Sequence, residues 1–181
     1  MFIQTETTPN PATLKFVPGE IVMKQGVANF PNRENAAKSP LAEALFRING
    51  VEAVYLGADF ISVTKASAKQ WDAIKVEILT AIMDHYVAGK PIMLEEGDIA
   101  AATSEDSDII KQIKEIIDTR VRPAVAQDGG DIIFHSFEEG VLKLEMHGSC
   151  SGCPSSTVTL KSGIENMMKH YVPEVESVEA V

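Results

Sequence analysis

Residues 141–154 read VLKLEMHGSCSGCP, and this stretch decides the fold of the second half of the chain. Apolar and charged side chains alternate in VLKLEMH, which predicts a strand with one buried face and one face turned to solvent. Pro154 follows Cys153 directly, and proline is well tolerated at the first residue of a helix. We therefore expect Cys150 and Cys153 in a short connection between a strand and a helix.

The sequence on both sides of this stretch predicts a small unit with the order helix, strand, strand, helix. An isoleucine-rich helix is expected to begin at about Ser107, and Pro123 is expected to end or kink it. Gly129-Gly130 then turns the chain into the strand IIFHSF, and Glu139-Gly140 separates that strand from VLKLEMH. The helix after the cysteines is expected to run to Pro173, with a short closing strand in VESVEAV.

The first half of the chain predicts a second unit of similar size. MFIQTE is strand-like and TTPNPA is turn-rich, and in TLKFVPGEIVM the residues Pro18 and Gly19 interrupt two apolar stretches as a turn would, which indicates a hairpin. VEAVYLGADFISVTK indicates a second hairpin around Gly57. Ser39 and Pro40 resemble the cap and first residue of a helix. Residues 70–89 place apolar side chains on one helical face before a glycine stop, so this unit is expected to cover residues 1–90.

Residues 91–106 carry five acidic and no basic side chains and show no sustained periodicity. This composition predicts a linker, with the second unit covering residues 107–181. The predicted fold class is α/β in the broad sense, or α+β: two small two-layer α/β domains joined by an acidic linker.

The composition also limits the classes of partner. With a net charge of −10 and no basic run, the chain is not expected to bind nucleic acid, and no apolar run approaches the roughly 18 residues that span a membrane. The start shows no export or transit signal, so we expect a cytoplasmic protein. In that reducing compartment the two cysteines are available as ligands or as a redox pair.

The Cys150-x-x-Cys153 pair is compatible with several chemistries. It fits a thiol-disulfide oxidoreductase, a zinc-bridged interaction module, an iron-sulfur site, or two small buried residues that happen to be cysteine. Zinc and iron-sulfur sites both want four ligands, and the chain supplies two thiolates. A two-fold symmetric dimer would supply four, at a partly exposed subunit edge suited to a cluster that has to leave.

Other chemistry-bearing residues have simpler interpretations. His147 is expected on the solvent face of its strand, and His85, His135 and His170 are expected to be surface or satisfied histidines. Asp128 to Asp131 is interpreted as a turn with flanking caps, and Arg122 as a cation that suits a helix C-terminus.

Two long segments carry a resemblance to a known family. DTRVRPAVAQDGGDIIF and MHGSCSGCPSSTVTLKSGIENMMKHYVPEV resemble the C-terminal NifU-like domain of Nfu-type iron-sulfur proteins. MFIQTETTPNPATLKF, SPLAEALF and GVEAVYLGADFISVTK are similar to the N-terminal domain of the same proteins. Together they span nearly the whole chain apart from the acidic linker.

The resemblance implies a scaffold or carrier rather than an enzyme. It implies that Cys150 and Cys153 from two protomers of a homodimer bridge one 4Fe-4S cluster, which is received from upstream cluster-assembly proteins and passed to apo iron-sulfur client proteins. The chain lacks the additional scaffold and ferredoxin-like cysteines of full-length NifU and the presequence of mitochondrial relatives. We therefore expect no primary cluster building and a bacterial cytoplasmic location.

Overall fold

The computed structural model describes residues 1–94, 107–151 and 154–181, with the backbone alone for residues 154–157. The chain divides into two compact units, Met1–Ala100 and Ala101–Val181. Each unit has its own cluster of buried apolar side chains. The two units are described separately below.

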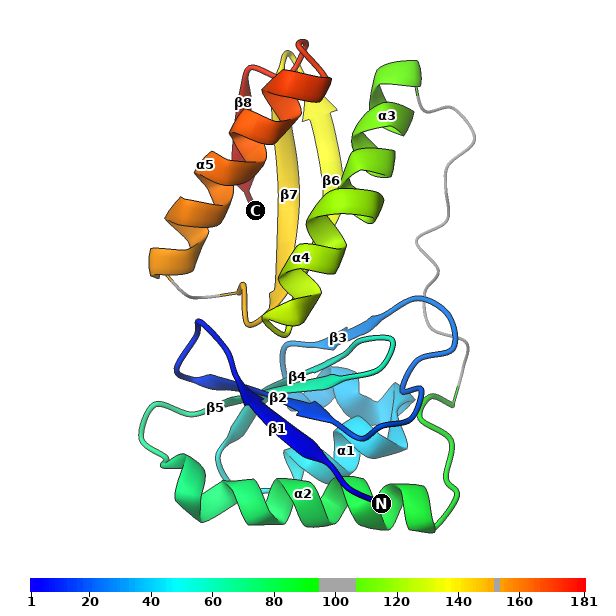
Figure 1. The fold of residues 1–181 in the computed structure, drawn as a ribbon. Coiled ribbons are helices and arrows are strands. Elements are labelled where there is room, and N and C mark those ends of the chain that lie inside the picture. The colour runs from blue at the N-terminus through cyan, green and yellow to red at the C-terminus, as the bar shows by residue number, and fades with distance from the viewer. Residues whose placement is uncertain (95–106, 152–153) are drawn as a thin grey trace. The chain divides into compact units, whose positions relative to one another are not determined.

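The first unit contains a five-stranded antiparallel sheet with the order β1-β2-β5-β4-β3 (Figure 1). Its strands are β1 Gln4–Thr7, β2 Thr13–Val17, β3 Ala28–Phe30, β4 Val51–Leu56 and β5 Ile61–Lys65. The pair β4-β5 is the predicted hairpin around Gly57. The turn predicted at Pro18-Gly19 does not form a hairpin, because β2 pairs with β1 and with β5 instead. The segment after Pro18-Gly19 is irregular, and the chain returns to the sheet only at β3.

Helices cover one face of this sheet (Figure 1). They are a 3-10 helix at Arg33–Lys38, α1 at Pro40–Phe46 and α2 at Trp71–Val87. Ser39 caps α1 as predicted, because its Oγ accepts a hydrogen bond from the backbone N–H of Ala42 at 3.1 Å. The inner side chains of α1 and α2 are buried with those of β2, β4 and β5.

The second unit opens with one long helical stretch that continues past Pro123, where the sequence predicted an end or a kink. It consists of α3 at Asp108–Ile116, a π-helical turn at Ile117–Val121 and α4 at Arg122–Gln127. A proline cannot donate to the carbonyl four residues back, and its ring crowds that carbonyl. The chain accommodates Pro123 by widening the preceding turn, where the N–H of Arg122 donates to Ile117 O, five residues back.

Three strands and a last helix complete the second unit. The elements are β6 Gly130–Glu138, β7 Val141–Gly148, α5 Pro154–Tyr171 and β8 Ser177–Ala180. The turn between β6 and β7 has positive φ at Glu139 and Gly140, which matches the twist of a tight hairpin. The predicted closing strand β8 pairs in parallel with β7, and α5 is the crossover between them.

Helices α3, α4 and α5 lie over one face of the β6-β7-β8 sheet (Figure 1). Ile113 and Ile117 from the first helical stretch and Met168 from α5 are fully or nearly fully buried against β6 and β7. Each unit therefore has two layers, which confirms the predicted α+β fold class. Within the described residues, every helix is too short or too polar to traverse a lipid bilayer.

Most of the predicted linker, 91–106, lies outside the described residues, and the boundaries 1–90 and 107–181 stay predictions. Residues 92–94 are hydrogen-bonded to the first unit. Ser39 Oγ donates to Ile92 O at 2.6 Å, and Leu94 N–H donates to Lys38 O at 2.8 Å. Met93 packs against the first core. Ser39 is fully buried and makes both the helix cap and this tether.

We expect Ser39→Ala to lower the free energy of unfolding of the first unit by about 1–3 kcal/mol, because it removes a cap and leaves the partly buried Ile92 carbonyl without its donor. Urea denaturation followed by the fluorescence of Trp71 measures this change. Thr80→Ala is the control: Thr80 is exposed and bonds only within α2, to Val76 O at 2.8 Å. Equal stability of the Ser39 variant and the wild type would contradict the expectation.

Candidate functional site

Cys150 lies in the turn that connects β7 to α5, as the sequence predicts. The turn is closed by a hydrogen bond from Ser151 N–H to Gly148 O at 3.1 Å. The Cys150 side chain is only 3% exposed and belongs to the second core, so this sulfur is covered rather than presented at an open edge. Cys153 lies outside the described residues, and the predicted pairing of the two sulfurs at one site stays a prediction.

Two glycines bring β6 against the Cys150 sulfur. Gly130 and Gly148 are cross-strand partners in the β6-β7 pair. A Cβ atom on Gly130 would lie 2.3 Å from Cys150 Sγ, and one on Gly148 would lie 2.5 Å from Gly129 O. Gly148 also has a φ of 65°, a conformation that favours glycine. No side chain fits at either position unless this part of the turn moves.

Ser149 hydrogen-bonds the end of β7 to the turn that precedes β6. Its Oγ donates to Asp128 O at 2.5 Å, and its N–H donates to Gly129 O at 3.2 Å. Ser149 is 2% exposed, so both bonds are shielded from water. We call residues 128–130 and 148–150, which touch in this way, the glycine clasp. Within the glycine clasp, Gly130 lies against the Cys150 sulfur.

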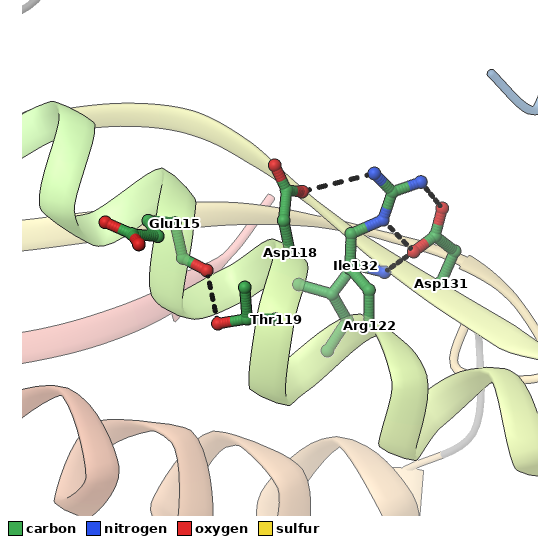
Figure 2. A network of polar contacts seen from close by, with 6 residues as sticks. All are labelled: Glu115, Asp118, Thr119, Arg122, Asp131 and Ile132. Carbon is green, nitrogen blue, oxygen red and sulfur yellow. Dashed lines mark hydrogen bonds and ion pairs between the residues drawn. The ribbon is translucent and has the colours of Figure 1, made fainter. Parts of the chain in front are cut away.

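An ion pair anchors β6 directly after the glycine clasp (Figure 2). Arg122 of α4 holds Asp131 with two hydrogen bonds, Nε to Oδ1 at 2.8 Å and Nη2 to Oδ2 at 2.9 Å. Asp131 is 4% exposed, and its Oδ1 also accepts from the backbone N–H of Ile132 at 2.8 Å. The hydrogen bond to Asp131 raises the pKa of Arg122 further above its usual value. The guanidinium is therefore charged at every working pH.

A second, more exposed carboxylate contacts the same guanidinium. Asp118 Oδ1 lies 3.2 Å from Arg122 Nη1 (Figure 2). The Asp118 side chain is 62% exposed, whereas that of Asp131 is 6% exposed. A bidentate pair to a buried carboxylate is much stronger than one exposed contact, so Asp131 is the principal partner.

The Arg122-Asp131 pair was missed by sequence reasoning. Gly129 does form a turn with a φ of 74°, but Asp131 is not a cap: it lies in β6 and binds a helix residue nine positions earlier. Arg122 does not serve a helix C-terminus either, because α4 begins with it. The sequence did hold one signal for this ion pair: an arginine precedes the Gly129-Gly130 turn, and an aspartate follows the turn directly.

The histidine predictions are partly wrong. His147 is 8% exposed rather than solvent-facing, and its Nε2 lies 2.8 Å from Glu145 Oε1. His85 is buried in the first unit, where burial lowers its pKa. His135 is exposed, with Nδ1 3.3 Å from Ser136 Oγ. In the described part of the chain, no group of three or more His, Cys, Asp or Glu side chains could hold a metal ion.

Comparison with known proteins assigns both units to one family. Residues 3–89 match the family model described as scaffold protein Nfu/NifU N terminal, and residues 113–179 match the NifU-like domain. The chain is 52% identical over 185 aligned residues to "NifU-like protein 4, mitochondrial" of Arabidopsis thaliana, which covers 99% of this chain and 65% of that protein. It is 49% identical over 183 residues to "NFU1 iron-sulfur cluster scaffold homolog, mitochondrial" of Homo sapiens, covering 100% of this chain and 72% of that one.

The chain therefore belongs to the Nfu family of iron-sulfur cluster scaffold proteins. This confirms the resemblance found in the sequence. The chain spans about two thirds of the length of the Arabidopsis relative.

The expected cytoplasmic location is wrong by the same comparison. The plant, insect and human relatives at about half identity are all named mitochondrial proteins. The expectation depended on the missing presequence, and the relatives are longer than this chain, so the start of the chain is no guide to a leader.

We expect Gly130→Ala to destabilise the second unit by about 1–3 kcal/mol, because the added methyl group forces Cys150 and the neighbouring backbone apart. Thermal unfolding measured by circular dichroism tests it. Gly163→Ala is the matched control: Gly163 is helical, and a Cβ there meets nothing within 4 Å. The free energy of unfolding of this control variant is expected to rise by about 0.5–1 kcal/mol. Equal effects of the two substitutions would mean that contact with Cys150 does not matter.

Proposed function

We propose that this chain is an iron-sulfur cluster carrier that binds a 4Fe-4S cluster through Cys150 and Cys153 of two copies and transfers it to apo-proteins. The cluster is cargo, received from upstream assembly proteins and surrendered to the cysteines of a client. The protein performs no catalytic turnover of its own. The family to which both units belong is the observation that carries this proposal.

The count of ligands supports the sharing of the cluster between two copies. A 4Fe-4S cluster takes four thiolates, and the chain contains two cysteines. Within the described residues no other side-chain group offers a metal site. Two copies related by a two-fold axis would supply four thiolates from identical surfaces.

The place of Cys150 in the chain suits a ligand that becomes accessible only when its turn opens. It lies in the turn between β7 and α5, and the first turn of α5 contains no acidic residue that would repel an anionic sulfur. The thiolate is the form that binds metal, and burial in an apolar core disfavours it. Because Cys150 is 3% exposed, loading and release both require the turn to open locally.

Anaerobic reconstitution of the full chain is expected to give about two irons and two acid-labile sulfides per chain, in a dimer. Iron and sulfide analysis, zinc analysis and native mass spectrometry on the same sample measure this. A monomer that retains a whole cluster would contradict the sharing. A dimer that holds zinc alone would support the zinc-bridged alternative, and reversible disulfide turnover in the monomer would support an oxidoreductase.

Cys150→Ala and Cys153→Ala are each expected to reduce bound iron and sulfide at least about tenfold, since each removes two of the four thiolates in the dimer. Alanine is preferred to serine at position 150 because Cys150 belongs to the second core, where a hydroxyl would be costly to bury. Ser151→Ala, an exposed change in the same turn, is expected to load normally. Circular dichroism checks that each variant folds, and full loading of either cysteine variant would refute the ligand assignment.

A further inference from the structure

Arg122 and Asp131 lie on the two sides of the turn that covers Cys150. Arg122 is the first residue of α4, and Asp131 is the second residue of β6. Between them the chain passes through Gly129 and then Gly130, whose backbone contacts Cys150 Sγ. We infer that the Arg122-Asp131 ion pair is a positioning device for Cys150, which keeps the glycine clasp closed and sets how often the sulfur becomes accessible.

The two hydrogen bonds of the pair tie a helix to the first residues of a strand. Because Gly130 precedes Asp131 directly, a displacement of the β6 backbone at Asp131 also displaces Gly130. Gly130 already lies so close to Cys150 that an added Cβ would stand 2.3 Å from Sγ, so repulsion opposes further approach and favours movement away from the sulfur. Loss of the pair therefore removes the side-chain anchor of β6 and leaves its pairing with β7 to hold the strand side of the glycine clasp.

Besides the backbone pairing of β6 with β7, the remaining side-chain contacts of the glycine clasp act at the turn. Ser149 bonds to Asp128 O and Gly129 O, both before Gly130 in the chain. Asp131 therefore provides the polar side-chain anchor on the other side of Gly130, and its own partner comes from α4. Removal of the Arg122 charge also leaves the buried Asp131 carboxylate without its cation, which favours opening to water.

Any effect of the Arg122-Asp131 pair on cluster transfer rests on the proposed function. The effect of the pair on the accessibility of Cys150 does not. A carrier must hold its ligand sulfur in place and must also release it to a client. The opening frequency of the glycine clasp would limit both the uptake and the surrender of a cluster at Cys150. Arg122 touches neither the sulfur nor the cargo, so it is a positioning residue and not a ligand.

The test uses reduced apo-protein, full chain, without oxygen. Iodoacetamide alkylation of Cys150 is followed by site-resolved mass spectrometry in the wild type, Arg122→Gln, Asp131→Asn and Asp118→Asn. We expect Arg122→Gln and Asp131→Asn to label at Cys150 at least about ten times faster, through local opening. Asp118→Asn is the matched control, because it removes the exposed contact to the same guanidinium and keeps the bidentate pair, and it is expected to stay within about twofold of wild type.

Urea separates this role from a general loss of stability. Local opening exposes little surface, so labelling below the unfolding transition should hardly depend on urea concentration. If labelling instead rises steeply with urea and in step with the unfolding equilibrium constant, the pair is merely structural and the inference fails. Unchanged labelling in folded Arg122→Gln and Asp131→Asn would also overturn it.

Arg122→Lys keeps the test decisive if the first two variants do not fold. A lysine retains the charge but cannot reproduce the two parallel hydrogen bonds, so Cys150 is expected to label about three times faster than in wild type. No acceleration in Arg122→Lys would refute the inference. Failure of the wild type to take up iron and sulfide would refute the proposed function and leave the labelling result standing.

Discussion

The contact between the Gly130 backbone and the Cys150 sulfur is the constraint on which the rest of the second unit depends. A Cβ at Gly130 would stand 2.3 Å from Cys150 Sγ, so β6 can pair with the end of β7 only where that residue has no side chain. The sulfur at this contact is buried, with Cys150 only 3% exposed. Sheet pairing and the environment of the reactive atom are thus set by one pair of residues.

Much of the fold was predictable because local rules agree with the packing. Ser39 and Pro40 mark a real helix start, Glu139-Gly140 forms the hairpin turn, and the last residues form the closing strand. These signals depend on the backbone preferences of a few neighbouring residues. The family resemblance was equally local, since it followed from contiguous stretches of sequence.

The sequence was a poor guide wherever the outcome depended on contacts between distant residues. Period-two alternation put His147 on the solvent face, and it does lie opposite the core face, yet it is buried. Pro123 predicted an end or a kink in the helix, and the helix does not end there because the turn before it widens and becomes π-helical. Asp131 looked like part of a capped turn because nothing in the sequence shows that Arg122 folds back onto it.

The covered Cys150 sulfur and the departing cluster of the proposed function make opposite demands on one turn. If Cys150 were fully exposed, oxidants and stray metals would reach it as easily as a partner protein does. If it were rigidly buried, it could neither accept nor release the cluster that the proposed function assigns to it. A closed state that opens at a set frequency meets both demands. On the inference drawn above, an anchor next to Cys150, such as Asp131 in β6, adjusts that frequency without altering the proposed ligand itself.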